Sequence, residues 1–348
     1  MSRPPTGAAA LSGDTEEAPA AGPAARHAGA PGEGPAIVYI AGSGRSGSTL
    51  LERALGEIPG FINVGELIDL FRRDAPRSER CGCGRPLGDC PFWSGIGERA
   101  YDNWDSGQLA AVERLKRHVA RQRHIPRLLA LPLAGRSFRA DVRGYGASYA
   151  ALYRAIASAA TARCVVDASK WPAQALALSR AGLDVRVIHL IRDVRGVAYS
   201  LSKQGVQRPH ALSDSDVMWN KKPAAAAARW VARQTEIELM HRLGVPVTRV
   251  RYEDFVRRPR PTVEKALTGL GLSYDPQHLE HLGDGRVTLG ASHGIAGNPS
   301  RFRAGEITLR VDEEWRERMS RRNRAFVTAI GLPLMVCYGW GRRRDVAA

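Results

Sequence analysis

The chain of 348 residues contains no run of 18 apolar residues, and its first residues include no short apolar segment of the kind that a secretion signal needs. A membrane-spanning helix requires about 20 predominantly apolar residues, and a signal peptide requires an apolar core. The sequence therefore predicts neither a membrane span nor secretion, and we expect a cytoplasmic protein.

Nucleic-acid-binding motifs are missing as well, although the formal net charge is +16. The chain has no zinc-finger spacing, no aromatic RNA-binding motif and no basic zipper. A large excess of Lys and Arg attracts anions in general, and it also reflects base composition in Arg-rich genomes. We therefore expect an anionic ligand and no nucleic-acid partner.

Cysteine is scarce, with five residues in the chain. Cys81, Cys83 and Cys90 lie close together in CGCGRPLGDCPFW, whereas Cys164 and Cys337 lie in apolar runs typical of small buried side chains. Three neighbouring thiols could bind zinc, but no fourth ligand is obvious and the C-x-C spacing is not that of a standard zinc ribbon. Free or locally cross-linked cysteines are the alternative.

The first 34 residues are rich in Ala, Gly and Pro and show no apolar periodicity. Such a segment cannot bury enough apolar surface to fold. We therefore expect a disordered tail over residues 1–34 and a single domain over residues 35–348.

Four strand-like runs recur along this domain: AIVYIAG, CVVDAS, DVRVIHLIRD and VPVTRVRYED. Each is short, β-branched and followed by a helical pattern, which predicts an α/β fold of three layers with a central parallel sheet flanked by helices. A further short strand is expected to end at Glu66.

Two helical segments, Leu109 to Leu133 and Ala147 to Ala160, interrupt the strand-helix alternation and are expected to form a cap or a side wall. A later segment, residues 216–243, predicts one long helix or two helices broken near Pro223. The polar stretch before it, residues 205–216, predicts a loop over the site.

The run IVYIAGSGRSGSTLLERALG joins a strand to a helix through a Gly/Ser loop. Gly42, Gly47 and Thr49 have the spacing of the phosphate-binding pattern G-x-x-x-x-G-K-[ST]. Ser48 stands where that pattern has Lys, and a cation appears earlier, at Arg45. Backbone N–H groups and a helix N-terminus favour an anion here; the alternative is an ordinary Gly-rich turn.

A second segment of interest is LIRDVRGVAYSLSKQG, in which Arg192 follows a strand and Ser200 stands eight residues later. A guanidinium and a hydroxyl near one helix start can together hold a phosphate. The alternative is a structural ion pair between Arg192 and an acid such as Asp193.

Together these two segments resemble the donor-binding segments of the cytosolic and Golgi sulfotransferases, and in particular those of bacterial members of the family. The resemblance extends over about residues 36–340 and includes RYEDFVRRP and, loosely, GNPSRFRAG. It implies a P-loop-like sulfotransferase fold with a helical cap insert, and 3′-phosphoadenosine 5′-phosphosulfate (PAPS) as the co-substrate. Because PAPS has no β- or γ-phosphate, the missing Lys and the missing Mg²⁺ ligands are expected.

The resemblance also assigns the residues that bind the donor. It places Arg192 and Ser200 at the 3′-phosphate, and it implies that Arg301 and Arg303 add charge there. The residues that it places around the 5′-phosphosulfate are Gly44, Arg45, Ser46, Gly47, Ser48 and Thr49.

The catalytic residues implied by the resemblance are Glu66, Lys170 and Arg45. Glu66, in NVGEL, would be the general base for the acceptor hydroxyl, and Lys170, in VVDASKWP, would contact the leaving phosphate oxygen. Glu66 could instead cap a helix or pair with Arg72 or Arg73. His189 alternates into a strand, and we expect it to be a packed core residue.

Two other functions compete with sulfuryl transfer. A small-molecule kinase with this loop would need the Lys that Ser48 replaces, and a non-catalytic anion-binding protein on the same scaffold would not need both Glu66 and Lys170. The sequence leaves open the oligomeric state and the acceptor, whether a carbohydrate, a natural product or a protein tyrosine.

Overall fold

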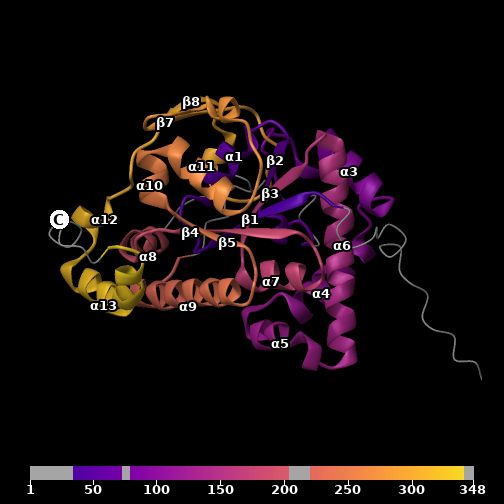
Figure 1. The fold of residues 1–348 in the computed structure, drawn as a ribbon, viewed down its shortest axis with the longest axis horizontal. Helices are drawn as coiled ribbons and strands as arrows, with labels where there is room; N and C mark the ends of the chain where they lie inside the picture. The colour runs from indigo at the N-terminus through magenta and orange to yellow at the C-terminus, as the bar shows by residue number, and fades with distance from the viewer. Residues whose placement is uncertain (1–33, 73–78, 204–219, 341–348) are drawn as a thin grey trace, which may run out of the picture.

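The computed structural model describes residues 34–72, 79–203 and 220–340 (Figure 1). Nearly all of the expected tail and the predicted loop over residues 205–216 lie outside these ranges.

The centre of the molecule is a five-stranded parallel sheet with the strand order β2-β3-β1-β4-β5. Its strands are β1 (Ala36–Gly42), β2 (Phe61–Gly65), β3 (Cys164–Lys170), β4 (Val185–Ile191) and β5 (Val247–Arg251). These are the predicted strands, including the short strand before Glu66. In parallel sheets the carboxyl ends of the strands lie at one edge, so the segments that follow them lie near each other.

Helices cover both faces of this sheet (Figure 1). Side chains alternate along β1, because successive residues of a strand point to opposite faces. Ile37, Tyr39 and Ala41 pack into one apolar core, and Val38 and Ile40 pack into another. The predicted three-layer α/β fold is therefore confirmed. The helices nearest the sheet are α1 (Ser48–Gly56), α7 (Pro172–Arg180), α9 (Pro223–Arg242), α10 (Tyr252–Arg257) and α11 (Pro259–Gly269).

A third apolar cluster joins α8 (Val194–Ser202) and α9 to α12 (Trp315–Arg318) and α13 (Arg321–Cys337). Residues 216–243 were predicted to form one long helix or two helices broken near Pro223. The structure has a helix that begins at Pro223, and at this first-turn position the missing N–H of proline costs nothing. Residues 216–219 lie outside the described ranges.

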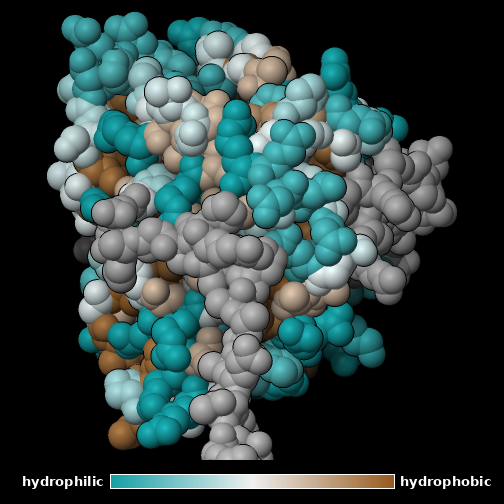
Figure 2. Space-filling model, turned by 90° about the vertical axis from the view of Figure 1, so that its right-hand side faces the viewer, coloured by the Kyte–Doolittle hydropathy of each residue, from teal (hydrophilic) through white to brown (hydrophobic). Residues whose placement is uncertain are grey.

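The expected helical insert between β2 and β3 is present, but its helices differ from the prediction and do not line the main cavity. It consists of α3 (Pro91–Tyr101), α4 (Ser106–Val119), α5 (Ile125–Leu129) and α6 (Arg136–Ala160). The single helix expected over residues 109–133 is wrong, because the chain breaks after Val119 and restarts before Pro126, which cannot continue a helix from the previous turn. Figure 2 shows the side of the molecule that carries α3 and α6, where hydrophilic side chains predominate on the part not covered in grey.

A small antiparallel sheet with the order β6-β7-β8 was not predicted. Its strands are β6 (Leu282–Gly283), β7 (Arg286–Leu289) and β8 (Gly305–Thr308), too short for a clear alternation signal. The short 3₁₀ helices are η2 (Leu67–Asp69), η3 (Leu87–Asp89), η4 (Gln122–His124), η5 (Leu131–Leu133), η6 (Pro276–Leu279) and η7 (Pro299–Phe302). Among the helices of the described ranges, none has the length and apolarity that crossing a membrane requires.

Candidate active site

A cavity of about 610 Å³ lies where β1, β3 and β4 end. This volume is in the range of pockets that hold small ligands and cofactors. Of the residues that the sequence singled out, the cavity is lined by Gly44, Arg45, Gly47, Ser48, Thr49, Glu66, Lys170, Arg192, Ser200 and Arg303. The structure thus brings together residues that are up to 259 positions apart in the chain, from the loop after β1 to the segment after η7.

The loop between β1 and α1 presents an uncapped helix N-terminus to the cavity. Helix α1 begins at Ser48, no side chain caps it, and no acidic residue lies in its first turn. Gly47 has a φ of 86°, and a Cβ there would lie 2.5 Å from the Tyr252 ring. Only glycine fits this turn, and its presence leaves the N–H groups at the helix start accessible to an anion.

Two buried hydroxyl groups in this loop have no partner within the described ranges. Ser43 Oγ and Ser46 Oγ are buried without a hydrogen bond. Buried polar groups normally have hydrogen-bond partners. These two hydroxyls therefore fit a site in which a bound anion accepts their hydrogen bonds. Ser43 lines the cavity, whereas Ser46 does not. The hydroxyl of Thr49 accepts a hydrogen bond from the backbone N–H of Asn298 at 3.1 Å.

Backbone strain is concentrated around the cavity. Among the described residues, five non-glycine residues have positive φ, and three of them, Arg45, Lys170 and Ala296, line the cavity. Arg45 has a φ of 67° and Lys170 a φ of 68°. Such conformations cost about 1–3 kcal/mol each and persist where surrounding structure imposes them. The fold therefore fixes the two cations implied by the sequence in unusual backbone conformations.

Glu66 and Lys170 form an ion pair within the cavity. Their side chains are 15% and 12% exposed, so water reaches both. The backbone N–H of Glu66 donates to Ile295 O at 2.9 Å, which fixes the segment after β2. Of the alternatives for Glu66, helix capping is not observed, since no side chain caps η2, and its carboxylate forms an ion pair with Lys170. Arg73 lies outside the described ranges.

Arg192 and Ser200 line the same cavity; Arg192 lies between β4 and α8, and Ser200 lies near the end of α8. The Arg192 guanidinium donates to Arg45 O at 2.7 Å and pairs with Asp312 at 2.9 Å. It also lies over the Tyr252 ring, 4.7 Å from the ring centroid. Tyr252 belongs to the RYEDFVRRP segment, which thus contacts both the loop after β1 and Arg192.

The two arginines of GNPSRFRAG lie in different environments. Arg303 is exposed and lines the cavity. Arg301 is 2% exposed and does not line it; its guanidinium donates to the backbone carbonyls of Gly294, Ala296 and Arg80. Arg301 thus connects residues 294–296 to Arg80 by hydrogen bonds and is not a cavity residue.

Several cavity residues were missed by the sequence analysis. Arg229 and Arg233 reach the cavity from α9, where Arg233 donates to Gly42 O at 3.1 Å and lies over the Trp171 ring. Arg229 and Arg233 are four residues apart on a predicted helix, and this spacing indicates that both side chains lie on the same helix face. Burial lowers the pKa of Arg233, and Arg229 adds to this effect.

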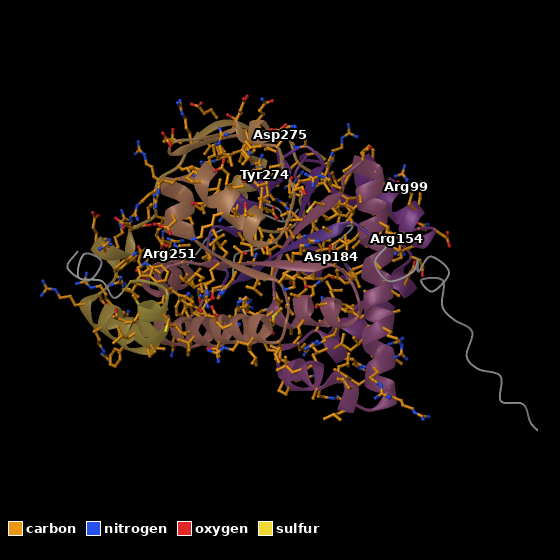
Figure 3. The ribbon with its side chains drawn as sticks, viewed as in Figure 1. Arg99, Arg154, Asp184, Arg251, Tyr274 and Asp275 are labelled. Carbon is orange, nitrogen blue, oxygen red and sulfur yellow. The ribbon has the colours of Figure 1, made fainter. Side chains whose placement is uncertain are left out.

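The electrostatic character of the cavity is strongly positive. Its described lining includes nine basic side chains and three acidic ones, Glu66, Asp69 and Asp312. Other cations are distributed elsewhere, as Arg99 on α3 and Arg251 at the end of β5 illustrate on opposite sides of the molecule (Figure 3). A concave site with this excess of cations attracts anionic ligands.

Two buried carboxyl groups lie next to the Glu66–Lys170 pair. Burial raises the pKa of Glu52 to about 8, against the attraction of Lys170. Burial also raises the pKa of Asp167 to about 6, although Tyr153 and Ser169 donate hydrogen bonds to it. Asp167 is fully buried, and its carboxylate accepts these hydrogen bonds.

His189 is a buried residue of β4, as expected. Its Nε2 atom lies 2.5 Å from Gln234 Oε1 and its Nδ1 atom 3.3 Å from Glu238. It does not line the cavity.

The fold and the site define a P-loop-like α/β protein whose cavity is suited to an anion. The model of the sulfotransferase family matches residues 35–276, more than half of the chain. The chain therefore belongs to the sulfotransferase family and is an enzyme of this class, as the sequence resemblance implied.

Solved structures similar to this chain include bacterial sulfotransferases. The sulfotransferase domain of the Synechococcus PCC 7002 olefin synthase is 19% identical, with 86% of this chain and 95% of that domain covered and a TM-score of 0.46. The sulfotransferase domain from the curacin biosynthetic pathway is 16% identical, with 86% and 97% covered and a TM-score of 0.47. Sulfotransferase STF1 from Mycobacterium tuberculosis H37Rv is 17% identical, with 74% and 72% covered and a TM-score of 0.37. No curated protein matches the chain.

Proposed function

We propose that this enzyme transfers the sulfuryl group of PAPS to a hydroxyl group of an acceptor, with Glu66 as the general base and without a metal ion in the cavity. The observation that carries the proposal is the ion pair of Glu66 and Lys170 in a cationic cavity, next to the loop after β1. A binding protein would need the cations but not a carboxylate among them, because a carboxylate repels an anionic ligand.

The residues present fit a PAPS-sized ligand with two anionic ends. The uncapped start of α1 and the unpartnered Ser43 hydroxyl fit the 5′-phosphosulfate. Arg192 and Ser200 fit the 3′-phosphate, and Arg303 adds charge at the rim of the cavity. Arg301 is not included in this set, because its guanidinium is committed to three backbone carbonyls.

The donor supplies an activated sulfuryl group on a phosphate that can leave. Glu66 accepts the proton of the acceptor hydroxyl as the new O–S bond forms. Lys170 and Arg45 place positive charge where the bridging S–O bond breaks and negative charge develops on the departing phosphate oxygen. This arrangement requires Lys170 to leave Glu66 for the donor, which restores an unpaired carboxylate facing the acceptor.

The cavity residues beyond Glu66 select the acceptor. Asp69 and Arg72 come from the start of the insert between β2 and β3, and Trp171 offers an aromatic face. These residues suit a polar acceptor that carries a ring, such as a sugar or a phenol.

Isothermal titration calorimetry with 3′-phosphoadenosine 5′-phosphate, the desulfated product, and with ATP plus Mg²⁺ tests the proposal. We expect the bisphosphate to bind and ATP to bind at least tenfold more weakly. Tighter binding of ATP with Mg²⁺ would favour a kinase, and absence of binding by the bisphosphate would remove the PAPS assignment. Binding of the bisphosphate with no transfer of labelled sulfonate to sugars, phenols or peptides would favour an anion-binding role.

A further inference from the structure

The cysteine cluster acquires a fourth member in the folded chain. Cys81, Cys83 and Cys90 lie in the segment before α3, and the structure brings His293 to them from 203 residues beyond Cys90. One ligand atom from each of the four residues lies within 4.8 Å of the others. No sequence pattern predicts this fourth ligand, because nothing local links His293 to the cysteines.

Three of the six separations between these atoms are close to the edges of a tetrahedron around one ion, and all six are below 4.8 Å. His293 Nδ1 lies 3.4 Å from both Cys81 Sγ and Cys90 Sγ, and Cys83 Sγ lies 3.7 Å from Cys90 Sγ. Tetrahedral zinc with ordinary Zn–S and Zn–N bonds gives S–S edges of about 3.8 Å and S–N edges of about 3.6 Å. We propose that Cys81, Cys83, Cys90 and His293 bind one structural zinc ion.

The chemical types of the four ligands identify the metal, and their number identifies its role. Three thiolates and one imidazole in tetrahedral positions are typical ligands of zinc, whereas magnesium and calcium prefer oxygen. Four protein ligands leave no open position for a substrate, as in structural zinc sites. Binding releases the three thiol protons to solvent, and the neutral imidazole coordinates through Nδ1.

Contacts around the cluster hold its members in place. The His293 ring stacks on Phe92 with a centroid distance of 4.5 Å and an interplanar angle of 14°. Trp93 Nε1 donates to His293 O at 2.9 Å. Two backbone hydrogen bonds close the turn that carries Cys81 and Cys83, from Cys81 N to Arg85 O and from Gly84 N to Cys81 O, each at 2.9 Å.

The ion would join two segments that form a wall of the cavity. Gly82 N donates to Gly294 O, and Ile295 N donates to Val64 O in β2. The next two residues, Ala296 and Gly297, line the cavity beside Glu66. Zinc therefore connects the insert between β2 and β3 to residues 292–298. It holds this wall of the cavity in place and takes no part in the reaction.

Metal analysis of the untagged full chain, purified without chelator, tests this inference independently of PAPS. We expect one zinc per chain by elemental mass spectrometry, retained through gel filtration and released by a mercurial reagent. Replacement by Co²⁺ should give the intense visible bands of tetrahedral coordination and sulfur-to-cobalt charge-transfer absorption. Substoichiometric zinc in wild-type protein, a spectrum of octahedral cobalt, or a disulfide between two of the cluster cysteines in protein purified without oxidant would overturn the site.

Variants separate the proposed ligands from other cysteines and histidines. Cys90→Ser and His293→Ala should lose zinc and melt several degrees lower. Cys337→Ser and His278→Asn change exposed residues outside the cluster and should keep one zinc; Cys337 is exposed on α13, so its expected burial is wrong. His293→Cys should retain zinc as a four-thiolate site, even if His293→Ala does not fold. Equal zinc in wild type and Cys90→Ser would contradict the assignment. Because no readout uses activity, failure here would leave the proposed sulfuryl transfer intact.

Discussion

Glu66, the residue after β2, forms an ion pair with Lys170, the last residue of β3. The two strands are neighbours in the sheet, so parallel pairing brings their ends together. In the proposed reaction Lys170 moves from Glu66 to the donor, so that the base and the leaving-group cation come to lie on either side of the transferred group.

Replacing Glu66 by Gln should lower kcat at least about a hundredfold, the scale of general base catalysis. Affinity for the bisphosphate product and the melting temperature should change little, because Gln keeps the shape and the side chain is partly exposed. Steady-state kinetics, calorimetry and thermal melting measure the three quantities.

Glu98→Gln is the matched control for Glu66→Gln, since Glu98 is an exposed glutamate on α3 outside the cavity. It should keep kcat within a few fold. Parallel loss of stability and activity in Glu66→Gln would instead make the ion pair structural.

Arg192→Ala should weaken binding of the bisphosphate by about 2 kcal/mol or more, the scale of a charge-assisted hydrogen bond. Arg249→Ala removes an exposed arginine outside the cavity and should leave affinity unchanged. Asp312→Asn should strengthen binding, because Asp312 pairs with the guanidinium that the phosphate needs. Unchanged affinity in Arg192→Ala would refute its assignment to the 3′-phosphate.

The two arginines after Asn298 should behave differently. Arg301→Ala should lower the melting temperature, because it leaves three carbonyls without their donor, at about 1–3 kcal/mol for an unsatisfied group. Arg303→Ala should weaken product binding and leave the melting temperature unchanged, since Arg303 is exposed. An Arg301→Ala variant as stable as wild type but unable to bind the bisphosphate would restore the sequence-based role of Arg301.

Turnover should not depend on added Mg²⁺. The loop after β1 lacks the lysine that reaches β- and γ-phosphates, with Ser48 in its place. Rates measured with Mg²⁺ and after brief exposure to EDTA should agree, with zinc content checked after each assay so that the structural ion is accounted for. Loss of activity with EDTA that Mg²⁺ alone restores would favour a kinase.

Glu52 should make the protein less stable as the pH rises. Its pKa in the folded chain is about 8, above an ordinary value of 4.5, so between these values the folded chain keeps a proton that the unfolded chain loses. The free energy of unfolding therefore falls as pH rises through this window. At about 1.4 kcal/mol per pKa unit, the full effect is at most a few kcal/mol.

Glu52→Gln removes this titration. The variant should melt above wild type at pH 8, and the difference should shrink toward pH 5. Glu280→Gln, at an exposed position, should follow wild type at both pH values. A difference independent of pH would mean that Glu52 does not titrate as its burial implies.

Local sequence was sufficient to predict the parallel sheet and the loop of the site. The β-branched runs specify strands, and the glycines at positions 42 and 47 permit the turn that exposes the start of α1. These features depend on residues that are neighbours in the chain. The cap helices were predicted less well, because helix ends such as the break after Val119 depend on packing as well as on propensity.

Only the tertiary structure decided which distant side chains meet. It paired Glu66 with Lys170, turned Arg301 away from the cavity and Arg303 toward it, and brought His293 to three cysteines. No local pattern encodes these contacts, because they depend on the order of the strands and on the path of the chain after β7. The sequence by itself therefore determined the class of fold and the anion-binding loop, and long-range packing determined the composition of the site.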